Sequence, residues 1–256
     1  MKVVVVGAGG FVGQRLCAEL ANQHDLSELV MIDQMPVGFP ADDHRLRVVQ
    51  GDFGNPELIK AHIAGAATVY LLASILGGAA EADYALARKV NIDSTLTLIE
   101  ALRDHDPRTR LVFASTIAVY AKPMPARVDD ATPTGPTMVY VAQKLMMEAA
   151  ISNFAARGWL DGVSLRLSGV MARDGADARL KSAFMSRVFF AIMRGEDIVL
   201  PVHPQSRTWL TSVATAARNF AHAGRLDASA LGRDRAFTLP TLLVTFEELV
   251  EARETI

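Results

Sequence analysis

Cysteine is almost missing from this chain: Cys17 is the single one among 256 residues, so no disulfide can form within it. Such a composition is typical of a reducing compartment, and we expect a cytoplasmic location. A surplus of charge is also missing, because 26 basic and 28 acidic residues leave a formal net charge of -2. That balance predicts no binding to nucleic acid or to an anionic membrane. The histidines lack metal-ligand spacing, and no metal is expected.

A long apolar run is the third missing feature. The candidate for a membrane span, residues 61–80, carries no formal charge, but it contains His62 and three glycines. Its apolar part, 69–76, is far shorter than a bilayer requires. A buried parallel strand flanked by loops explains the segment better, so no transmembrane segment is expected. The apolar run within residues 1–6 is too short for a secretory signal.

The chain does contain short β-branched runs that alternate with helix-like stretches from its first residue. The predicted strands are 3–6, 29–33, 46–50, 68–73, 111–115 and 162–167, with helices at 11–21, from 56, at 81–104 and at 137–156. After residue 167 we expect helices at 182–194, 212–223 and 246–254 and strands at 198–202 and 236–239. This order predicts an α/β fold with a doubly wound parallel sheet of Rossmann type. We divide it into a Rossmann domain, residues 1–167, and a small substrate-binding lobe, residues 168–256, with some interleaving of segments.

A glycine loop follows the first predicted strand and precedes the first helix. Gly7, Gly10 and Gly13 form a GxxGxxG pattern, with Gly9 as an additional glycine. Glycine lets the backbone turn tightly and approach a pyrophosphate, which then lies at the positive N-terminus of the helix. The strand-loop-helix context favours a dinucleotide site over a purely structural turn.

Asp33 ends the second strand, where a carboxylate can accept hydrogen bonds from the adenosine ribose hydroxyls. Because Gln34 and Met35 supply no cation for a 2′-phosphate, NAD is predicted rather than NADP. Asp52 follows the third strand, where it can meet the adenine edge while Phe53 covers it. An N-cap of the next helix is an equally good interpretation of Asp52.

Tyr140 and Lys144 occur as YVAQK, a spacing that places both side chains on one face of a helix. A nearby ammonium favours the phenolate, which brings the pKa of the tyrosine down from about 10 toward working pH. Ser115 and Thr116 end the fifth strand and so reach the carboxyl edge of the sheet, where ligands bind in such folds. One hydroxyl can stabilise charge on a substrate oxygen. The alternative is that both only satisfy backbone groups in a turn.

Taken in order, these motifs resemble the extended short-chain dehydrogenase/reductase family of NAD-dependent epimerases and dehydratases. The resembling stretches are GAGGFVG, Asp33, the GD at 51–52, VNIDST at 90–95, FASTIAVY at 113–120 and YVAQK. The resemblance implies that Thr116, Tyr140 and Lys144 are catalytic. It also implies that Asn91 supports the site, that Ser115 lines the nicotinamide, and that the chain forms a homodimer through the long helix and the Tyr-Lys helix.

Within the family, the chain is similar to the subfamily of D-erythronate dehydrogenases in EADYALARKVNIDST, LVFASTIAVYAKPMP, DGVSLRL and RTWLTSVATAARNFAHA. That likeness implies a small sugar acid as substrate, oxidised with NAD at its 2-hydroxyl. The chain departs from the subfamily at two places, Leu167-Ser168-Gly169 and Arg173-Asp174-Gly175, where the subfamily usually has an LP segment and an RPG loop. Arg173 is a candidate for gripping a carboxylate with two hydrogen bonds. Ser74 and Arg207 are weaker substrate candidates.

The complete set of expected cofactor contacts is Gly7, Gly10, Phe11, Val12, Gly13, Asp33, Asp52, Phe53, Leu72, Ala73, Asn91, Ser115, Tyr140 and Lys144. Two other functions stay open. A nucleotide-sugar epimerase or dehydratase uses similar motifs, although the short C-terminal lobe disfavours a nucleotide-bearing substrate. A non-catalytic dinucleotide sensor is disfavoured by the complete set of Thr116, Tyr140 and Lys144.

Overall fold

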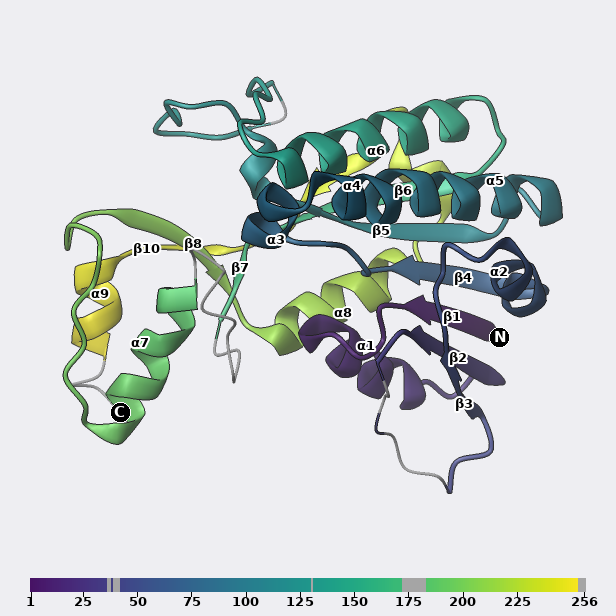
Figure 1. Cartoon of the computed structure of the whole chain (residues 1–256), viewed down its shortest axis with the longest axis horizontal. Helices are drawn as coiled ribbons and strands as arrows, with labels where there is room; N and C mark the ends of the chain where they lie inside the picture. The colour runs from purple at the N-terminus through teal and green to yellow at the C-terminus, as the bar shows by residue number, and fades with distance from the viewer. Residues whose placement is uncertain (36–37, 39–41, 130, 172–182, 253–256) are drawn as a thin grey trace.

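The chain forms an open parallel sheet that carries helices on both faces and continues into a smaller sheet (Figure 1). The computed structural model describes residues 1–35, 38, 42–129, 131–171 and 183–252. Within these residues the central sheet has seven strands in the order β3-β2-β1-β4-β5-β6-β9, and neighbouring strands run parallel. The strands are β1 (Lys2–Val6), β2 (Glu28–Asp33), β3 (Leu46–Gln50), β4 (Ala66–Leu71), β5 (Arg110–Thr116), β6 (Asp161–Leu167) and β9 (Ala236–Thr238). The predicted doubly wound α/β fold is confirmed.

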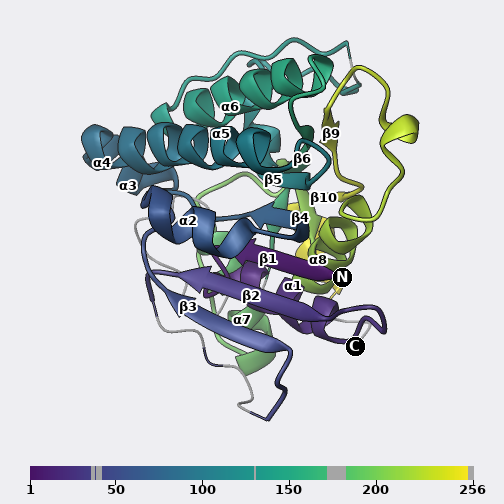
Figure 2. The same ribbon diagram turned by 90° about the vertical axis from the view of Figure 1, so that its right-hand side faces the viewer.

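Alternation along the strands makes both faces of the sheet apolar, as a sheet buried on two sides requires. Val3 and Val5 of β1 pack in one hydrophobic cluster with α1 and α8, whereas Val4 and Val6 pack in another with α2, α5 and α6. These helices are α1 (Phe11–Ala21), α2 (Pro56–Ile63), α5 (Thr95–His105), α6 (Val139–Ala156) and α8 (Val213–Ala223). Figure 2 shows α5 and α6 side by side on one side of the sheet.

The long helix expected at 81–104 is wrong as a continuous element. The segment consists of the end of α3 (Gly77–Ala82), α4 (Tyr84–Arg88), a π-helical turn (Lys89–Ser94) and α5. Asp83 interrupts it: its backbone has φ -136° and ψ 87°, and its side chain accepts a hydrogen bond from Leu86 N at the start of α4. Aspartate favours such a cap over a helix interior because its carboxylate competes for backbone N–H groups.

A second sheet continues from the carboxyl end of β6 (Figure 1). Its strands are β10 (Leu242–Thr245), β8 (Arg207–Thr211) and β7 (Gly169–Val170), accompanied by α7 (Ala183–Arg194) and α9 (Phe246–Glu251). The strand expected at 198–202 is wrong, since the stretch is irregular and Val199 is 94% exposed. Pro201 offers no N–H to a ladder. Residues after 167 also return to the central layer, because β9 pairs with β6 and α8 packs against α1.

The uncharged segment 61–80 contains the buried strand β4 and not a membrane helix. Val69, Tyr70 and Leu71 are at most 1% exposed within the sheet. None of the described helices combines the length and the apolar composition that crossing a bilayer requires.

Candidate active site

The glycine loop joins β1 to α1 and forms a backbone cradle. Gly7 has φ +90°, and a Cβ at this position would lie 2.5 Å from the backbone nitrogen of Ala73. A Cβ on Gly13 would lie 2.1 Å from the carbonyl oxygen of Gly7, so α1 approaches the loop this closely because residue 13 is glycine. Gly10 is the N-cap of α1, and no described side chain caps the helix. The first turn therefore presents the positive end of the helix dipole to the cleft, which suits a pyrophosphate.

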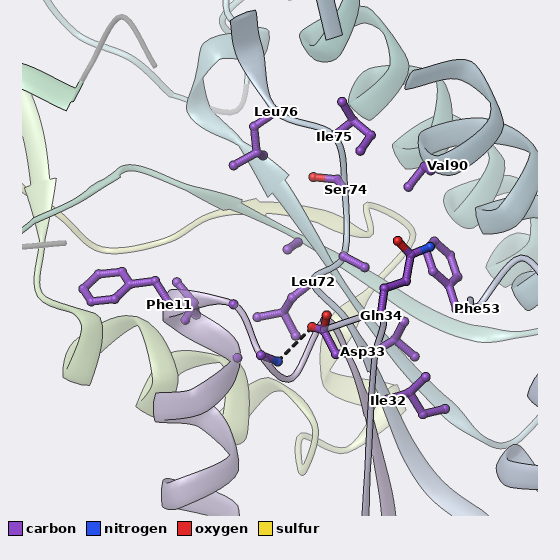
Figure 3. A pocket seen from close by; sticks show the side chains of 18 of the residues that line it. Phe11, Ile32, Asp33, Gln34, Phe53, Leu72, Ser74, Ile75, Leu76 and Val90 are labelled. Atoms are coloured by element: carbon purple, nitrogen blue, oxygen red, sulfur yellow. Dashed lines mark hydrogen bonds between the residues drawn. The ribbon is translucent and has the colours of Figure 1, made fainter. Parts of the chain in front are cut away.

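Asp33 ends β2 and fixes the same loop from the side. Its Oδ2 accepts a hydrogen bond from Gly9 N at 2.8 Å, drawn in Figure 3, and its Oδ1 accepts one from Met35 N at 3.0 Å. The carboxylate is therefore held at the cleft edge where a ribose would meet it. The neighbouring cleft residues Gln34 and Met35 carry no positive charge. This surrounding favours NAD over NADP, in agreement with the prediction from the sequence.

The cleft opens between the carboxyl ends of β1 and β4, where the strand order reverses. Such a switch point is the usual ligand site of an open α/β sheet. The cleft has a volume of about 430 Å³. Of the residues predicted to contact cofactor or substrate, its lining contains Gly7, Gly10, Phe11, Val12, Gly13, Asp33, Phe53, Leu72, Ala73, Ser74, Ser115, Tyr140 and Lys144. Figure 3 shows the loop after β4, with Ser74, Ile75 and Leu76, above the glycine loop and Asp33.

Tyr140 and Lys144 lie one turn apart on α6, and both line the cleft. The Lys144 side chain is buried, with Nζ 4.5 Å from the centre of the Phe113 ring and 5.8 Å from that of the Tyr140 ring. Burial disfavours the ammonium and lowers the pKa of Lys144 to about 7, while the Glu148 carboxylate acts in the opposite direction. A cation close to Tyr140 favours loss of its phenolic proton. The structure therefore brings together the two residues that YVAQK singled out.

The two hydroxyl residues at the end of β5 have different surroundings. Ser115 is buried, lines the cleft and donates its hydroxyl proton to Glu148. Thr116 is partly buried, and its Oγ1 accepts a hydrogen bond from Ala118 N at 3.2 Å, which is the turn contact that the alternative interpretation describes. Thr116 is not among the lining residues of the cleft. Because its oxygen accepts that bond, its own proton can still be donated to another oxygen.

Asn91 lies in the π-helical turn, outside the cleft lining. Its Oδ1 accepts a hydrogen bond from Ile75 N at 2.8 Å, and its Nδ2 donates to Ile75 O at 2.9 Å and to Gln143 Oε1 at 2.8 Å. Ile75 belongs to the loop that lines the cleft, whereas Gln143 precedes Lys144 on α6. Asn91 therefore ties the cleft loop to the helix of Tyr140, and a direct contact with the cofactor stays a prediction.

Asp52 also lies outside the cleft lining, although Phe53 is part of it. The Asp52 carboxylate accepts a hydrogen bond from Gly54 N at 2.8 Å. The interpretation of Asp52 as a helix N-cap is wrong, because Asn55 holds that position in α2 and accepts a hydrogen bond from Glu57 N at 3.0 Å. Contact between Asp52 and an adenine stays a prediction.

Of the three candidate substrate contacts Ser74, Arg173 and Arg207, the described lining of the cleft contains one. Ser74 lines the same cleft as Tyr140. Arg207 is exposed on β8, opposite Thr245 of β10, and is not among the lining residues. Arg173 lies outside the described residues, so its position is not part of the site described above.

Further residues line the cleft that were not among the expected contacts. They are Val6, Gly9, Ile32, Gln34, Met35, Gly51, Ile75, Leu76, Val90, Ala114 and Leu167. Most of them end a strand of the central sheet or follow one, so strand-end position in an open α/β sheet is the signal that finds them. Glu148, the buried partner of Ser115, was missed because a glutamate on a helix usually faces solvent.

Comparisons with known proteins agree with a dinucleotide site in this cleft. Residues 3–224 match the NAD dependent epimerase/dehydratase family. Over 98% of its length the chain is 32% identical to the D-erythronate dehydrogenases of Haemophilus influenzae and Cupriavidus necator, of which it covers 80% and 81%. The whole chain also resembles a crystal structure of a nucleoside-diphosphate-sugar epimerase from Agrobacterium tumefaciens, with a TM-score of 0.92 and 29% identity, and covers 78% of that chain.

Two features of the cleft fit a dinucleotide. A Cβ at Gly7 or Gly13 would collide with the backbone that shapes the cradle. The Lys144 side chain is buried beside the Phe113 and Tyr140 rings and lines the cleft, so its ammonium can donate a hydrogen bond to a ligand hydroxyl. The family match spans both features and Tyr140. This chain therefore belongs to the NAD-dependent epimerase/dehydratase family, the extended short-chain dehydrogenases and reductases, and is an NAD-dependent enzyme.

Proposed function

We propose that this enzyme oxidises a secondary hydroxyl of a small polyhydroxy acid, with D-erythronate as the first candidate. The observation that carries the proposal is the presence of Tyr140 and the buried Lys144 in the same cleft as the glycine cradle. The substrate class rests on the likeness to two D-erythronate dehydrogenases over nearly the whole chain. When bound, NAD supplies the hydride acceptor, and the glycine loop, Asp33 and Lys144 hold it.

Tyr140 takes the proton of the substrate hydroxyl as the general base. An isolated tyrosine has a pKa of about 10 and is a poor base at neutral pH. The Lys144 ammonium favours loss of the phenolic proton, and because the lysine side chain is buried, water screens its charge only weakly. Thr116 donates its hydroxyl proton to the substrate oxygen and orients it toward Tyr140.

The remaining substrate contacts come from outside this pair. Ser74 lines the cleft and is a hydrogen-bond partner for a further hydroxyl of the substrate. For the carboxylate, Arg173 and Arg207 are the candidates, because a guanidinium grips a carboxylate with two parallel hydrogen bonds. A substitution of each by methionine separates them: loss of the relevant arginine raises KM for a sugar acid far more than it lowers kcat.

The proposal includes a homodimer formed through α4 and α6, which contact each other. Tyr84 and Leu86 on α4 and Met146 on α6 are 60%, 44% and 55% exposed. Large apolar side chains gathered on neighbouring helices are typical of a protein interface. Sedimentation analysis of the double variant Leu86→Lys, Met146→Lys is expected to give monomers where the unmodified chain gives dimers.

The decisive test of the activity is NADH formation with NAD and a panel of three- to six-carbon aldonic acids, for wild type and Tyr140→Phe. Turnover on D-erythronate or a near relative, lost in Tyr140→Phe, is the expected result. A nucleotide-sugar epimerase is the second candidate, favoured by the likeness to the Agrobacterium structure. Epimerisation of a nucleotide sugar without net NADH, and no oxidation of any acid, would replace the first proposal with the second.

A further inference from the structure

A buried carboxylate lies directly behind the cleft and has no part in the mechanism above. Glu148 is 3% exposed and follows Lys144 by four residues on α6, which places the two side chains on the same face of the helix. It does not line the cleft, although Ser115 and Lys144 on either side of it do. A charge buried at this position needs compensation.

The compensation comes from two strands. The Ser115 hydroxyl at the end of β5 donates to Glu148 Oε1. The Arg166 guanidinium on β6 forms a forked pair with the carboxylate, with Nη2 2.8 Å from Oε2 and Nε 3.1 Å from Oε1. Arg166 Nη1 also donates to Tyr120 Oη at 3.2 Å, and the Tyr120 and Thr238 hydroxyls lie 2.5 Å apart. Both oxygens of the Glu148 carboxylate therefore accept hydrogen bonds, and its charge is paired with the Arg166 guanidinium.

Such a pair is weak evidence for a contribution to stability, because apolar residues of the same volume often stabilise a core as well or better. The same two strands carry a second buried pair at their opposite ends, where Asp161 binds Arg110 at 2.8 Å and Arg235 at 3.1 Å. The two pairs resemble each other in chemistry and in burial. They differ in place, since the Glu148 pair alone adjoins Lys144 and Ser115.

The charges around Lys144 single out Glu148. Charged and titratable groups on α6 and on the elements packed against it include Glu81, Arg88, Lys89, Asp93, Glu100, Arg103, Asp104, His105, Arg110, Tyr120, Tyr140, Asp161 and Arg166. Among the described groups, Glu148 is the one whose field opposes the effect of burial on the pKa of Lys144. Arg166 takes most of the hydrogen-bonding capacity of Glu148 and so limits that field.

We propose that Glu148 is a positioning residue that maintains the Lys144 ammonium and fixes the Ser115 hydroxyl at the cleft, with Arg166 setting the strength of its field. Its effect on Tyr140 passes through Lys144, and this part rests on the proposed function. The charge relation between Glu148 and Lys144 does not depend on which substrate is oxidised.

The test follows the ionisation of Lys144 in protein free of cofactor. Urea unfolding free energies are measured against pH for pairs of proteins with and without Lys144→Met, in the wild-type, Glu148→Gln, Arg166→Met and Asp161→Asn backgrounds. In each pair, the pH at which the difference begins to change marks the pKa of Lys144 in the folded protein. In wild type this onset is expected at about 7.

Glu148→Gln is expected to move the onset down by about one unit or more, because the opposing negative charge is gone. Arg166→Met is expected to move it up, because Glu148 then faces Lys144 without a competing cation. Asp161→Asn loses a comparable buried pair and is expected to leave the onset unchanged. An onset that stays in place in Glu148→Gln and Arg166→Met, with loss of stability alone, would overturn the proposal and leave Glu148 a structural residue.

The same variants distinguish this inference from the proposed function. If a sugar acid is oxidised, the alkaline limb of the plot of kcat against pH is expected to move to lower pH in Glu148→Gln, and the plateau value of kcat is expected to fall. In Asp161→Asn the alkaline limb is expected to stay at the same pH. If no acid is oxidised but the unfolding onsets move as described, the proposed function fails and the positioning role holds.

Discussion

Replacing Lys144 by methionine is expected to stabilise the cofactor-free protein at neutral pH while abolishing activity. Lys144 is 3% exposed and lies over the Phe113 ring, so a methionine of similar length fills the same apolar space. The folded protein therefore bears a desolvation cost that the unfolded chain does not. Such a cost at a catalytic position is a trade of stability for function.

The magnitude follows from the displacement of the pKa of Lys144 to about 7. In the unfolded chain the pKa is about 10.4, so between these two values the unfolded state binds more protons than the folded state. Stability therefore rises as the pH increases from about 7 toward about 10. Linkage gives a cost of about 4 kcal/mol at pH 7 and about 2 kcal/mol at pH 9, a gain of about 2 kcal/mol over that interval.

Thermal unfolding of both proteins between pH 7 and pH 9 measures this difference. A gain of about 2 kcal/mol corresponds to a rise in Tm of about 4–8 °C in wild type relative to Lys144→Met. The pH range ends where the Cys17 thiol begins to ionise in the unfolded chain. In the folded protein burial raises the pKa of this thiol to about 12, so its ionisation in the unfolded chain makes stability fall as the pH rises further. Equal dependence of Tm on pH in the two proteins would refute the reasoning.

Three further predictions concern the cradle, the cofactor preference and the second lobe. Gly13→Ala places a Cβ 2.1 Å from Gly7 O, so it is expected to cost about 1–3 kcal/mol of stability and to weaken NAD binding, as measured by calorimetry. Asp33→Asn removes the negative charge at the ribose edge and is expected to lower the ratio of the NADP Kd to the NAD Kd by roughly tenfold; an unchanged ratio would contradict the assignment. Thr245→Ala removes the capping box of α9, in which the Thr245 hydroxyl accepts a hydrogen bond from Glu248 N and the Glu248 carboxylate accepts one from Thr245 N. It is expected to lower the free energy of unfolding in urea by about 1 kcal/mol without changing NAD affinity.

Much of the site could be predicted because its signals are local in the sequence. The glycine loop, Asp33 and the Tyr140–Lys144 spacing each lie within one strand-loop-helix unit or one helical turn. The βαβ pattern then determines which strand ends meet, so the cleft at the carboxyl ends of β1 and β4 follows from topology. The helix at Phe11–Ala21 is confirmed with the predicted bounds.

The features that escaped prediction depend on contacts between distant segments. The break at Asp83 places Asn91 where it bridges Ile75 and Gln143, and neither partner is near it in sequence. The buried Glu148 on α6 is paired with Arg166 on β6, a contact that the sequence does not reveal. The apolar run at 198–202 has strand propensity but pairs with no described strand, so propensity alone gave the wrong element.

The central claim is that hydride leaves the carbon that bears the 2-hydroxyl of a sugar acid while Tyr140 takes the hydroxyl proton. The most direct measurement uses D-erythronate deuterated at that carbon, with NAD and the wild-type enzyme, followed by mass spectrometry of the nicotinamide and the acid. The account predicts deuterium in the reduced cofactor in proportion to oxidised acid, and none with Tyr140→Phe. Deuterium that stays in the acid, or transfer that persists in Tyr140→Phe, would contradict it.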